Sequence, residues 1–354
     1  MAMKKLFILA LMILAFGMLF GCLDILNPSK ENQTTAGDGS TVVGDNTVKP
    51  KDDGLVIIGS TNQSVVDVNN NNVNNITNGN GVVPQTDGMG YTYAPDEKMA
   101  IYFIDVGDEE RHGDSILIKK GDFDMLVDAG TEENAGRVVD FLKAHNVDDI
   151  DVLVSTSAIA ENYGGMKQVL DNFKVEELWY GGNSFNNLTY EGILSEAESK
   201  GAKIVVVERG DEKDFNGAEF DILNPKRVPF GDPANDAIVI KITNGVNTFL
   251  LTSDIKTGAQ GDLMNNYDLR GDVIMVPYHG LGVGNPQFNF FLSKTTPSYF
   301  VITGGSNDDA AHGGDRQPLY RILDMNNIPY FATYEGGTIR IISDGSDYTI
   351  QYLQ

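Results

Sequence analysis

Imidazole and thiol groups, which act as general bases, nucleophiles and metal ligands, are rare in this chain, because its 354 residues include four histidines and one cysteine. His112 lies in the polar segment DEERHGDS, where it could reach a cleft or simply face solvent. His312 lies in DDAAHGGDRQP, where neighbouring aspartates form a polar cluster that could border a site or keep a loop soluble. His145 falls where a helix is expected to end, and a cation there interacts favourably with the helix dipole. His112 and His312 are therefore candidate cleft residues, whereas His145 is interpreted as structural.

Nucleophilic catalysis finds little support in the sequence. Ser115 and Ser253 lack the nucleophile-elbow pattern that exposes a catalytic serine on a sharp turn between a strand and a helix. Cys22 lies in an N-terminal stretch that is expected to be processed. The glycine-rich HGLGVGNP lacks the lysine and the βαβ context of a phosphate-binding loop, so a simple turn is predicted there.

Strands alternate with helices in the first half of the folded region. The segment 133–146 places Val138, Phe141 and Leu142 on one helical face. Strands that alternate with helices indicate a sheet whose faces are covered by helices. The predicted strands of this half are MAIYFIDV at 99–106, DSILIKK at 114–120, FDMLVDAG at 123–130, DVLVST at 151–156, ELWYG at 177–181 and KIVVVE at 203–208.

The second half repeats this mixture of strands and helices. Two β-rich halves, each with helices after its strands, predict an α/β fold arranged as a four-layer αββα sandwich. Periodicity alone could equally give two separate α/β domains. The predicted strands here are GAEFDILNP at 217–225, DAIVIKIT at 236–243, NTFLLTSD at 247–254, DVIMVPYHG at 272–280, SYFVITGG at 298–305, PYFAT at 329–333, GTIRIIS at 337–343 and YTIQYL at 348–353.

The ends of these strands resemble a known family pattern. FIDVGDEERHGDSILIKKGDFDMLVDAG is similar to the opening of the metallo-β-lactamase-fold domain of ComEC-type DNA-uptake proteins, and DVLVSTSAIAENYGG is similar to its next strand, metal motif and Gly-Gly helix start. NDAIVIKITNGVNTFLLTSD, DVIMVPYHG and PYFATYEGGTIRI match later parts of that domain in the same order. The resemblance covers about residues 99–351 and implies a metallo-β-lactamase-like fold.

The metal motif of that family is degenerate in this chain. The family reads His-x-His-x-Asp-His before the Gly-Gly pair, because paired zinc ions need nitrogen and carboxylate ligands that converge on two sites. Counting back from the glycines, this chain offers Ser157, Ile159, Glu161 and Asn162 at those places. A side chain such as Ile159 cannot coordinate a metal, and hydroxyl and amide oxygens suit zinc poorly. The resemblance therefore does not carry a paired zinc centre with it.

Two later positions keep the family's residue types. Asp254 matches the aspartate that bridges the metals, and His279 matches the second histidine of a His-His pair in which Tyr278 replaces the first. We predict no bound cofactor; if a metal binds, Glu161, Asp254 and His279 would hold a hard divalent ion such as Mg²⁺, Mn²⁺ or Ca²⁺. The alternative is that these carboxylates are ordinary polar groups that cap turns and helix starts. Tyr278, His112 and His312 are further candidates for the surrounding cleft.

The N-terminal region predicts export and anchoring. Residues 1–22 place two lysines before an apolar run, which is the arrangement of a signal peptide, and their Leu-Phe-Gly-Cys ending resembles a lipobox with Cys22 as the lipidated residue. A retained N-terminal anchor is the alternative, and both predict an extracytoplasmic, membrane-anchored protein at the cell surface. Residues 23–96 are rich in Asn and Gly and predict a flexible tether, which leaves 97–354 as the folded domain.

The charge of the chain limits its partners. A formal net charge of −24 disfavours direct nucleic-acid binding, because an acidic surface repels phosphate backbones. The predicted function is a catalytically degenerate binding module at the cell envelope, with a protein, glycan or nucleic acid as its partner. The alternative is a divergent metal-dependent hydrolase that acts on nucleic acid or another phosphodiester through a carboxylate-rich site. Trp179, Tyr180 and Tyr163 near the strand ends could form an aromatic binding patch or belong to the core.

Overall fold

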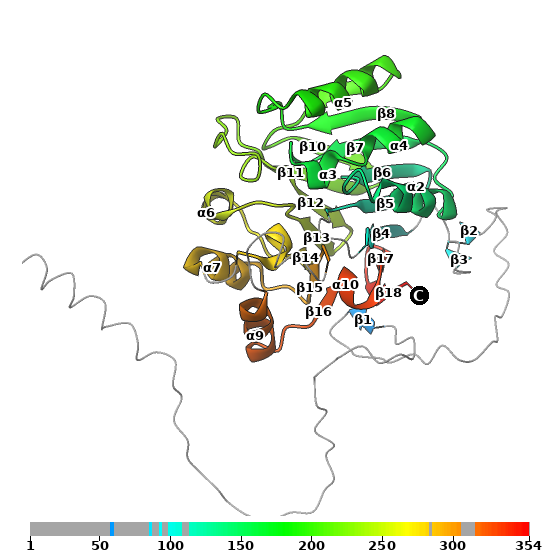
Figure 1. Cartoon of the computed structure of the whole chain (residues 1–354). Helices are drawn as coiled ribbons and strands as arrows, with labels where there is room; N and C mark the ends of the chain where they lie inside the picture. The colour runs from blue at the N-terminus through cyan, green and yellow to red at the C-terminus, as the bar shows by residue number, and fades with distance from the viewer. Residues whose placement is uncertain are drawn as a thin grey trace, which may run out of the picture. The chain divides into compact units, whose positions relative to one another are not determined.

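Two large β-sheets lie face to face, and helices cover the outer face of each (Figure 1). This arrangement is the four-layer αββα sandwich that the sequence predicts. The computed structural model describes residues 57–59, 85–86, 92–93, 98–107, 113–282, 285–305 and 316–353.

The first sheet has nine strands in the order β1-β18-β17-β4-β5-β6-β7-β8-β9. Its middle is a run of antiparallel hairpins, and β6 to β9 continue it as parallel strands joined by helices. The strands are β1 (Ile57–Gly59), β4 (Met99–Phe103), β5 (Ile116–Lys120), β6 (Phe123–Val127), β7 (Ile150–Ser155), β8 (Val175–Tyr180), β9 (Lys203–Val206), β17 (Ile339–Ser343) and β18 (Tyr348–Tyr352).

The second sheet has seven strands in sequence order, from β10 to β16. The pairs from β10 to β13 are antiparallel, and those from β13 to β16 are parallel. The strands are β10 (Glu212–Phe215), β11 (Ala218–Asn224), β12 (Val239–Asn244), β13 (Asn247–Leu251), β14 (Val273–Met275), β15 (Tyr299–Ile302) and β16 (Tyr330–Ala332). A separate pair, β2 (Gln85–Thr86) with β3 (Thr92–Tyr93), is antiparallel.

Helices of the first half pack on the first sheet, and helices of the second half pack on the second sheet. Among the described residues, no helix combines the length and apolar character that a membrane span requires. The helices are α2 (Ala135–Ala144), α3 (Ala160–Tyr163), α4 (Met166–Asn172), α5 (Leu188–Ser199), α6 (Thr257–Asn266), η1 (Pro277–Gly280), α7 (Pro286–Thr295), α9 (Gln317–Met325) and α10 (Thr333–Gly336).

Alternation along the strands builds the layers. In β5, Ile116 and Ile118 point into the core between the sheets, whereas Leu117 points outward under the helices, as the two-residue period of a strand requires. Trp179 is completely buried in the same central core. Because both sheets share this core, the alternative of two separate α/β domains is wrong.

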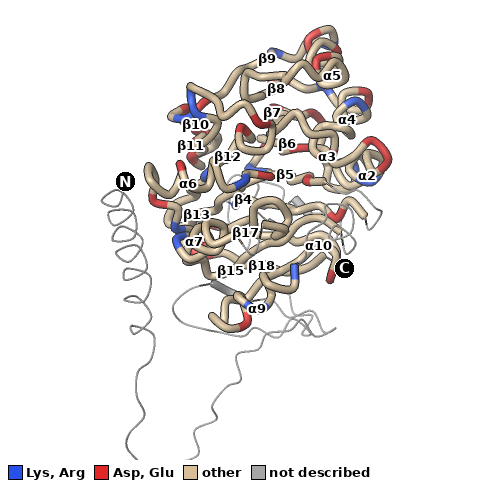
Figure 2. Tube along the Cα trace, turned by 60° about the vertical axis from the view of Figure 1, so that its left-hand side comes forward, with Lys and Arg blue, Asp and Glu red and all other residues tan. Residues whose placement is uncertain are grey.

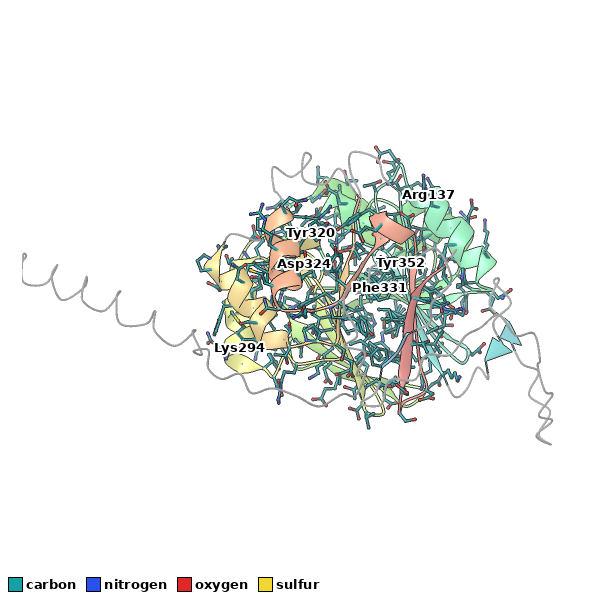
Figure 3. All side chains as sticks on the ribbon, turned by 90° about the horizontal axis from the view of Figure 1, so that it is seen from below. Arg137, Lys294, Tyr320, Asp324, Phe331 and Tyr352 are labelled. Carbon is teal, nitrogen blue, oxygen red and sulfur yellow. The ribbon has the colours of Figure 1, made fainter. Side chains whose placement is uncertain are left out.

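Aromatic contacts join the two sheets near the C-terminus of the chain. Phe331 of β16 and Tyr352 of β18 lie with ring centroids 5.1 Å apart, side by side in the view from below (Figure 3). The Tyr352 hydroxyl also accepts a hydrogen bond from the backbone N–H of Ala332 at 2.9 Å. The last strand of the first sheet is thereby fixed to the edge strand of the second.

A buried ion pair interrupts the apolar outer face of the first sheet. Lys119 of β5 and Asp124 of β6 are direct cross-strand partners, and the lysine Nζ lies 2.6 Å from both carboxylate oxygens. Burial raises the pKa of Asp124 to about 7, although Lys119 acts against this shift. Each group depends on the other, since a single buried charge without a partner is strongly unfavourable.

We expect Lys119→Met to lower the free energy of unfolding by about 3 kcal/mol, because it leaves Asp124 buried without its counter-ion. The loss should be larger at pH 8 than at pH 5. An aspartate whose folded pKa lies above its unfolded value of about 4 loses stability as the pH rises through the folded pKa. Urea unfolding at the two pH values measures both effects.

The double variant Lys119→Met/Asp124→Leu should recover most of the lost stability, because it removes both charges. Lys174→Met, which breaks a solvent-exposed pair with Glu176, serves as the control and should change the midpoint little. Equal losses for the buried and the exposed lysine would contradict a special role of the buried pair.

Candidate functional site

The parallel strands of both sheets end at one edge of the sandwich, and polar residues follow them there. Asp128 follows β6 and Thr156 follows β7, while Asp254, His279 and Thr303 come after β13, β14 and β15. The order of strands therefore gathers side chains that lie up to 175 positions apart in sequence, from Asp128 to Thr303 (303 − 128). Such an edge is where binding sites form in sheets of this kind.

Two carboxyl groups and one imidazole converge at this edge. His279 Nε2 lies 3.3 Å from Asp254 Oδ1, and His279 Nδ1 lies 3.8 Å from Asp114 Oδ1. One possible ligand atom from each residue lies within 4.8 Å of the others, and the three residues are 3%, 3% and 1% exposed. Within the described ranges, this is the one group of three or more His, Cys, Asp or Glu side chains that could hold a metal ion.

A second, hydrogen-bonded cluster surrounds Asp128, which is completely buried. Its carboxylate accepts hydrogen bonds from the Thr156 backbone N–H at 2.9 Å, from Thr156 Oγ1 at 2.6 Å and from Asn162 Nδ2 at 3.1 Å. Burial raises the pKa of Asp128 to about 8 and the Asp114 carboxyl adds to the shift, while these hydrogen bonds oppose it. Thr156 Oγ1 also lies 2.8 Å from Ser253 Oγ, so the cluster links the two sheets.

The backbone at these strand ends takes an unusual conformation. Asp128, Ser253, Tyr278 and His279 have φ angles of 58°, 49°, 51° and 50°, in the left-handed region that side chains with a Cβ rarely occupy. All four residues border the two clusters. Such strained residues persist where the surrounding structure fixes them, and they gather at functional sites.

The residues at the family's first zinc position do not fit a paired zinc centre. The Asn162 amide group is used as a donor to Asp128. Ser157 is buried, and its hydroxyl has no hydrogen-bond partner in the structure. Ile159 precedes α3 and supplies backbone carbonyl bonds to Asn162 and Tyr163 rather than a ligand. Half of the ligand set is thus replaced by hydrogen bonds and an apolar side chain.

Two of the three predicted metal ligands come together, and the third does not join them. Asp254 and His279 belong to the converging group, whereas Glu161 lies in α3 outside it, half-buried. Asp114 is the third member of the converging group, and the sequence analysis did not predict it. The sequence does contain a signal for Asp114, which is the Gly-Asp-Ser directly before β5. The start of β5 lies beside the end of β6 in an antiparallel pair, so a residue before β5 is expected near the residues that follow β6.

Arg316 fixes the backbone at His279, and the sequence analysis did not predict this contact either. Its Nε donates to the His279 carbonyl and its Nη1 to the Gly305 carbonyl, both at 2.7 Å. The guanidinium lies 4.8 Å from the ring centre of Tyr334 and is 2% exposed. Thr303 Oγ1 lies 3.3 Å from His279 Nδ1, so the backbone and the ring of the histidine are both fixed.

Of the remaining cleft candidates, the structure describes Tyr278 but not the two histidines. Tyr278 is half-buried, and the Lys256 ammonium lies 4.9 Å from its ring centre. His112 and His312 lie outside the described residues, as does Cys22.

The aromatic residues Trp179 and Tyr163 are 0% and 5% exposed, so these two rings belong to the core rather than to a surface patch.

A small cavity lies between the polar cluster and the central core. Its volume is about 10 Å³, and only apolar atoms face this space, although Asp114, Asp128, Thr156 and Ser253 are among the residues around it. That space is about as large as one water molecule, but its apolar surface offers such a molecule no hydrogen-bond partner.

Comparison with known proteins confirms the resemblance to ComEC-type proteins. No protein-family model matches the chain. It is 24% identical over 204 residues to ComE operon protein 3 of Bacillus subtilis, which covers 57% of this chain and 26% of that protein. It is 24% identical over 214 residues to competence protein ComA of Neisseria gonorrhoeae, covering 60% of this chain and 28% of that protein. The chain therefore matches about a quarter of the length of these relatives.

Solved structures of metallo-β-lactamase fold are similar as well. The metallo-β-lactamase fold protein YhfI of Bacillus subtilis aligns with a TM-score of 0.47 and 10% identity over 69% of this chain and 99% of that one. Igni18, a metallo hydrolase of Ignicoccus hospitalis, aligns with a TM-score of 0.45 and 11% identity over 69% of this chain and 98% of that one.

We expect Asn162→Asp to lower the free energy of unfolding by about 2 kcal/mol at pH 8, because it removes a donor and sets a second carboxyl against Asp128. The loss should shrink at pH 5, since two adjacent buried carboxyls have folded pKa values above their unfolded ones and regain stability as the pH falls. Thermal and urea unfolding at both pH values measure this difference. Asn172→Asp, at an exposed position on α4, is the control, and an equal effect of both changes would contradict the proposed contact.

Proposed function

We propose that this chain is a competence-related envelope protein whose ComEC-like domain binds a partner and does not catalyse zinc-dependent hydrolysis. The observation that carries the proposal is the hydrogen bond from Asn162 Nδ2 to Asp128, which uses a former ligand position as a structural donor. Ser157 and Ile159 at the neighbouring positions support it, because neither replaces an imidazole as a zinc ligand. The names of the relatives, ComE operon protein 3 and competence protein ComA, suggest the pathway.

The same proposal places the protein outside the cytoplasm. Residues 1–22 would direct export, lipid on Cys22 would hold the chain to the membrane, and the stretch between Cys22 and β1, which pairs with β18 of the domain, would let the domain reach its partner. The relatives are several times longer than the aligned stretch, and a membrane protein is one partner that the domain could bind.

The surface charge favours a protein or glycan partner over DNA. Figure 2 shows Lys and Arg dispersed among Asp and Glu along the described trace instead of gathered in one stripe. With a formal net charge of −24 for the chain, long-range forces repel a phosphate backbone. Nucleic acid would therefore have to reach this protein through another component.

A divergent metal-dependent hydrolase is the second candidate, and one observation favours it. Asp114, Asp254 and His279 form a group that could hold an ion. An ion there could activate water or stabilise negative charge on a phosphodiester. The buried position of all three side chains speaks against direct contact with a large substrate.

We expect the purified full-length chain in detergent to hydrolyse neither bis(p-nitrophenyl) phosphate nor single-stranded DNA above the level of its Asp254→Asn variant, with Zn²⁺, Mn²⁺ or Mg²⁺ present. The reason is that the ligands that would complete a water-activating centre are replaced. Release of nitrophenol and gel analysis of labelled DNA are the measurements. Metal-dependent turnover that disappears with Asp254→Asn would establish the hydrolase instead.

We expect Cys22→Ser to abolish lipid attachment, because serine cannot form the thioether of a lipoprotein. Mass spectrometry of the mature N-terminus and separation of membrane from soluble fractions test this outcome. The chain should shift away from the membrane fraction, or accumulate with its signal segment uncleaved and unlipidated. An unmodified Cys22 in the wild-type protein would favour a retained N-terminal anchor.

A further inference from the structure

The first sheet ends in a strand with an open edge. β9 is the last strand of the nine-stranded sheet and pairs with β8 alone among the described strands, as the top of Figure 2 shows. The Val207 backbone N–H donates to the Tyr180 carbonyl, so the odd-numbered residues of β9 turn their backbone groups toward β8. The N–H and C=O groups of Ile204 and Val206 therefore point away from β8, and no described strand pairs with them.

The edges of the second sheet are protected, in contrast to β9. β10 carries Glu212, Lys213 and Asp214, and charged side chains discourage the pairing of a further strand. At β16, the backbone N–H of Ala332 donates to the Tyr352 hydroxyl, which covers this edge from the neighbouring sheet. β9 has the sequence KIVV, in which the only charge is on the first residue. An apolar edge of this kind is a template for another strand.

The edge formed by β9 is accessible over its whole length. All four of its residues are exposed or half-buried, whereas five of the six residues of the inner strand β7 are buried. Val206 is 56% exposed, so its side chain would gain from burial against an apolar neighbour. Ile204 lies on the same face of the sheet and packs partly under the helices. An incoming strand would therefore meet both outward-facing backbone groups and apolar side chains.

The residue pattern of β9 suits a second copy of the same strand. Two copies related by a twofold axis through Val205 would pair antiparallel, with Ile204 of each copy opposite Val206 of the other. The outward N–H and C=O groups of these residues would then meet and form hydrogen bonds in both directions. The apolar side chains of the same residues would cover each other on the face of the sheet that carries the helices.

Charge selects this register over its neighbours. With the axis through Val205, Lys203 lies opposite Val207 of the second copy. An axis through Val206 would instead set Lys203 opposite Arg209, and like charges directly opposite each other are destabilising. An axis between two residues would place side chains from opposite faces of the sheet against each other, which the pleat does not allow.

We propose that the β9 edge joins two copies of this chain by antiparallel pairing of Lys203–Val206, which makes their first sheets continuous. The inference does not rest on the proposed function, because it concerns the lateral edge of the sheet and not the altered metal motif. A pair of short strands makes a small interface, so the dimer should form and dissociate with protein concentration.

The first test measures the mass of the full-length chain in detergent by sedimentation, with the detergent contribution matched, over a wide range of protein concentration. The protein mass should rise about twofold toward the highest concentration, because one interface related by a twofold axis closes at a dimer. Val206→Lys should weaken association about tenfold or more, since a lysine on an edge strand opposes pairing. Val228→Lys makes the same change at a 75% exposed valine outside the strands and should associate like the wild type.

A disulfide tests the register. In a Cys22→Ser background, Val205→Cys should give a covalent dimer on mild oxidation, because the two positions meet at the axis with Cα atoms about 4.5 Å apart. Val228→Cys in the same background measures chance collisions and should cross-link much more slowly. A wild-type mass of one chain at every concentration, undiminished association of Val206→Lys, or equal cross-linking of the two cysteine variants would each overturn the proposal.

Discussion

The direction of the parallel strands is the constraint on which the site depends. β6 to β9 in one sheet and β13 to β16 in the other require helical crossovers, and these crossovers place each carboxyl end at the same edge of its sheet. The central core then holds the two edges together. Asp128, Asp254 and His279 are neighbours for this reason.

The loop that enters α4 has kept its shape because its backbone packing requires glycine. A Cβ on Gly165 would lie 2.1 Å from the Ala129 carbonyl oxygen, and a Cβ on Gly113 would lie 1.5 Å from the Glu161 oxygen. The backbone N–H of Ala129 also donates to the Asn162 carbonyl. These contacts involve the main chain, so the side chains of the motif could change while the turn stayed intact.

Residue patterns predicted most of the fold but only part of the site. Alternation and apolar runs located the buried strands, because burial on a sheet leaves a direct trace in the sequence. β10 (Glu212–Phe215) was missed, since three of its four residues are charged and lie at a sheet edge. Asp114 and Arg316 were missed for another reason. Contacts between residues that are remote in sequence leave no periodic signal. The family motif, which lacks its histidines in this chain, also gave no indication of the remaining carboxylates.

Two buried carboxyl groups at the edge of the sandwich, Asp128 and Asp254, have different surroundings. Around Asp128, donors from Thr156 and Asn162 satisfy the buried carboxylate, so hydrogen bonds do what a metal ion does in a hydrolase of this fold. Around Asp254, the His279 Nε2 atom lies 3.3 Å from one carboxylate oxygen, and that oxygen has no hydrogen-bond donor. The two buried carboxyl groups at this edge are therefore satisfied to different extents, one by hydrogen bonds from both sheets and the other through the contact with the imidazole.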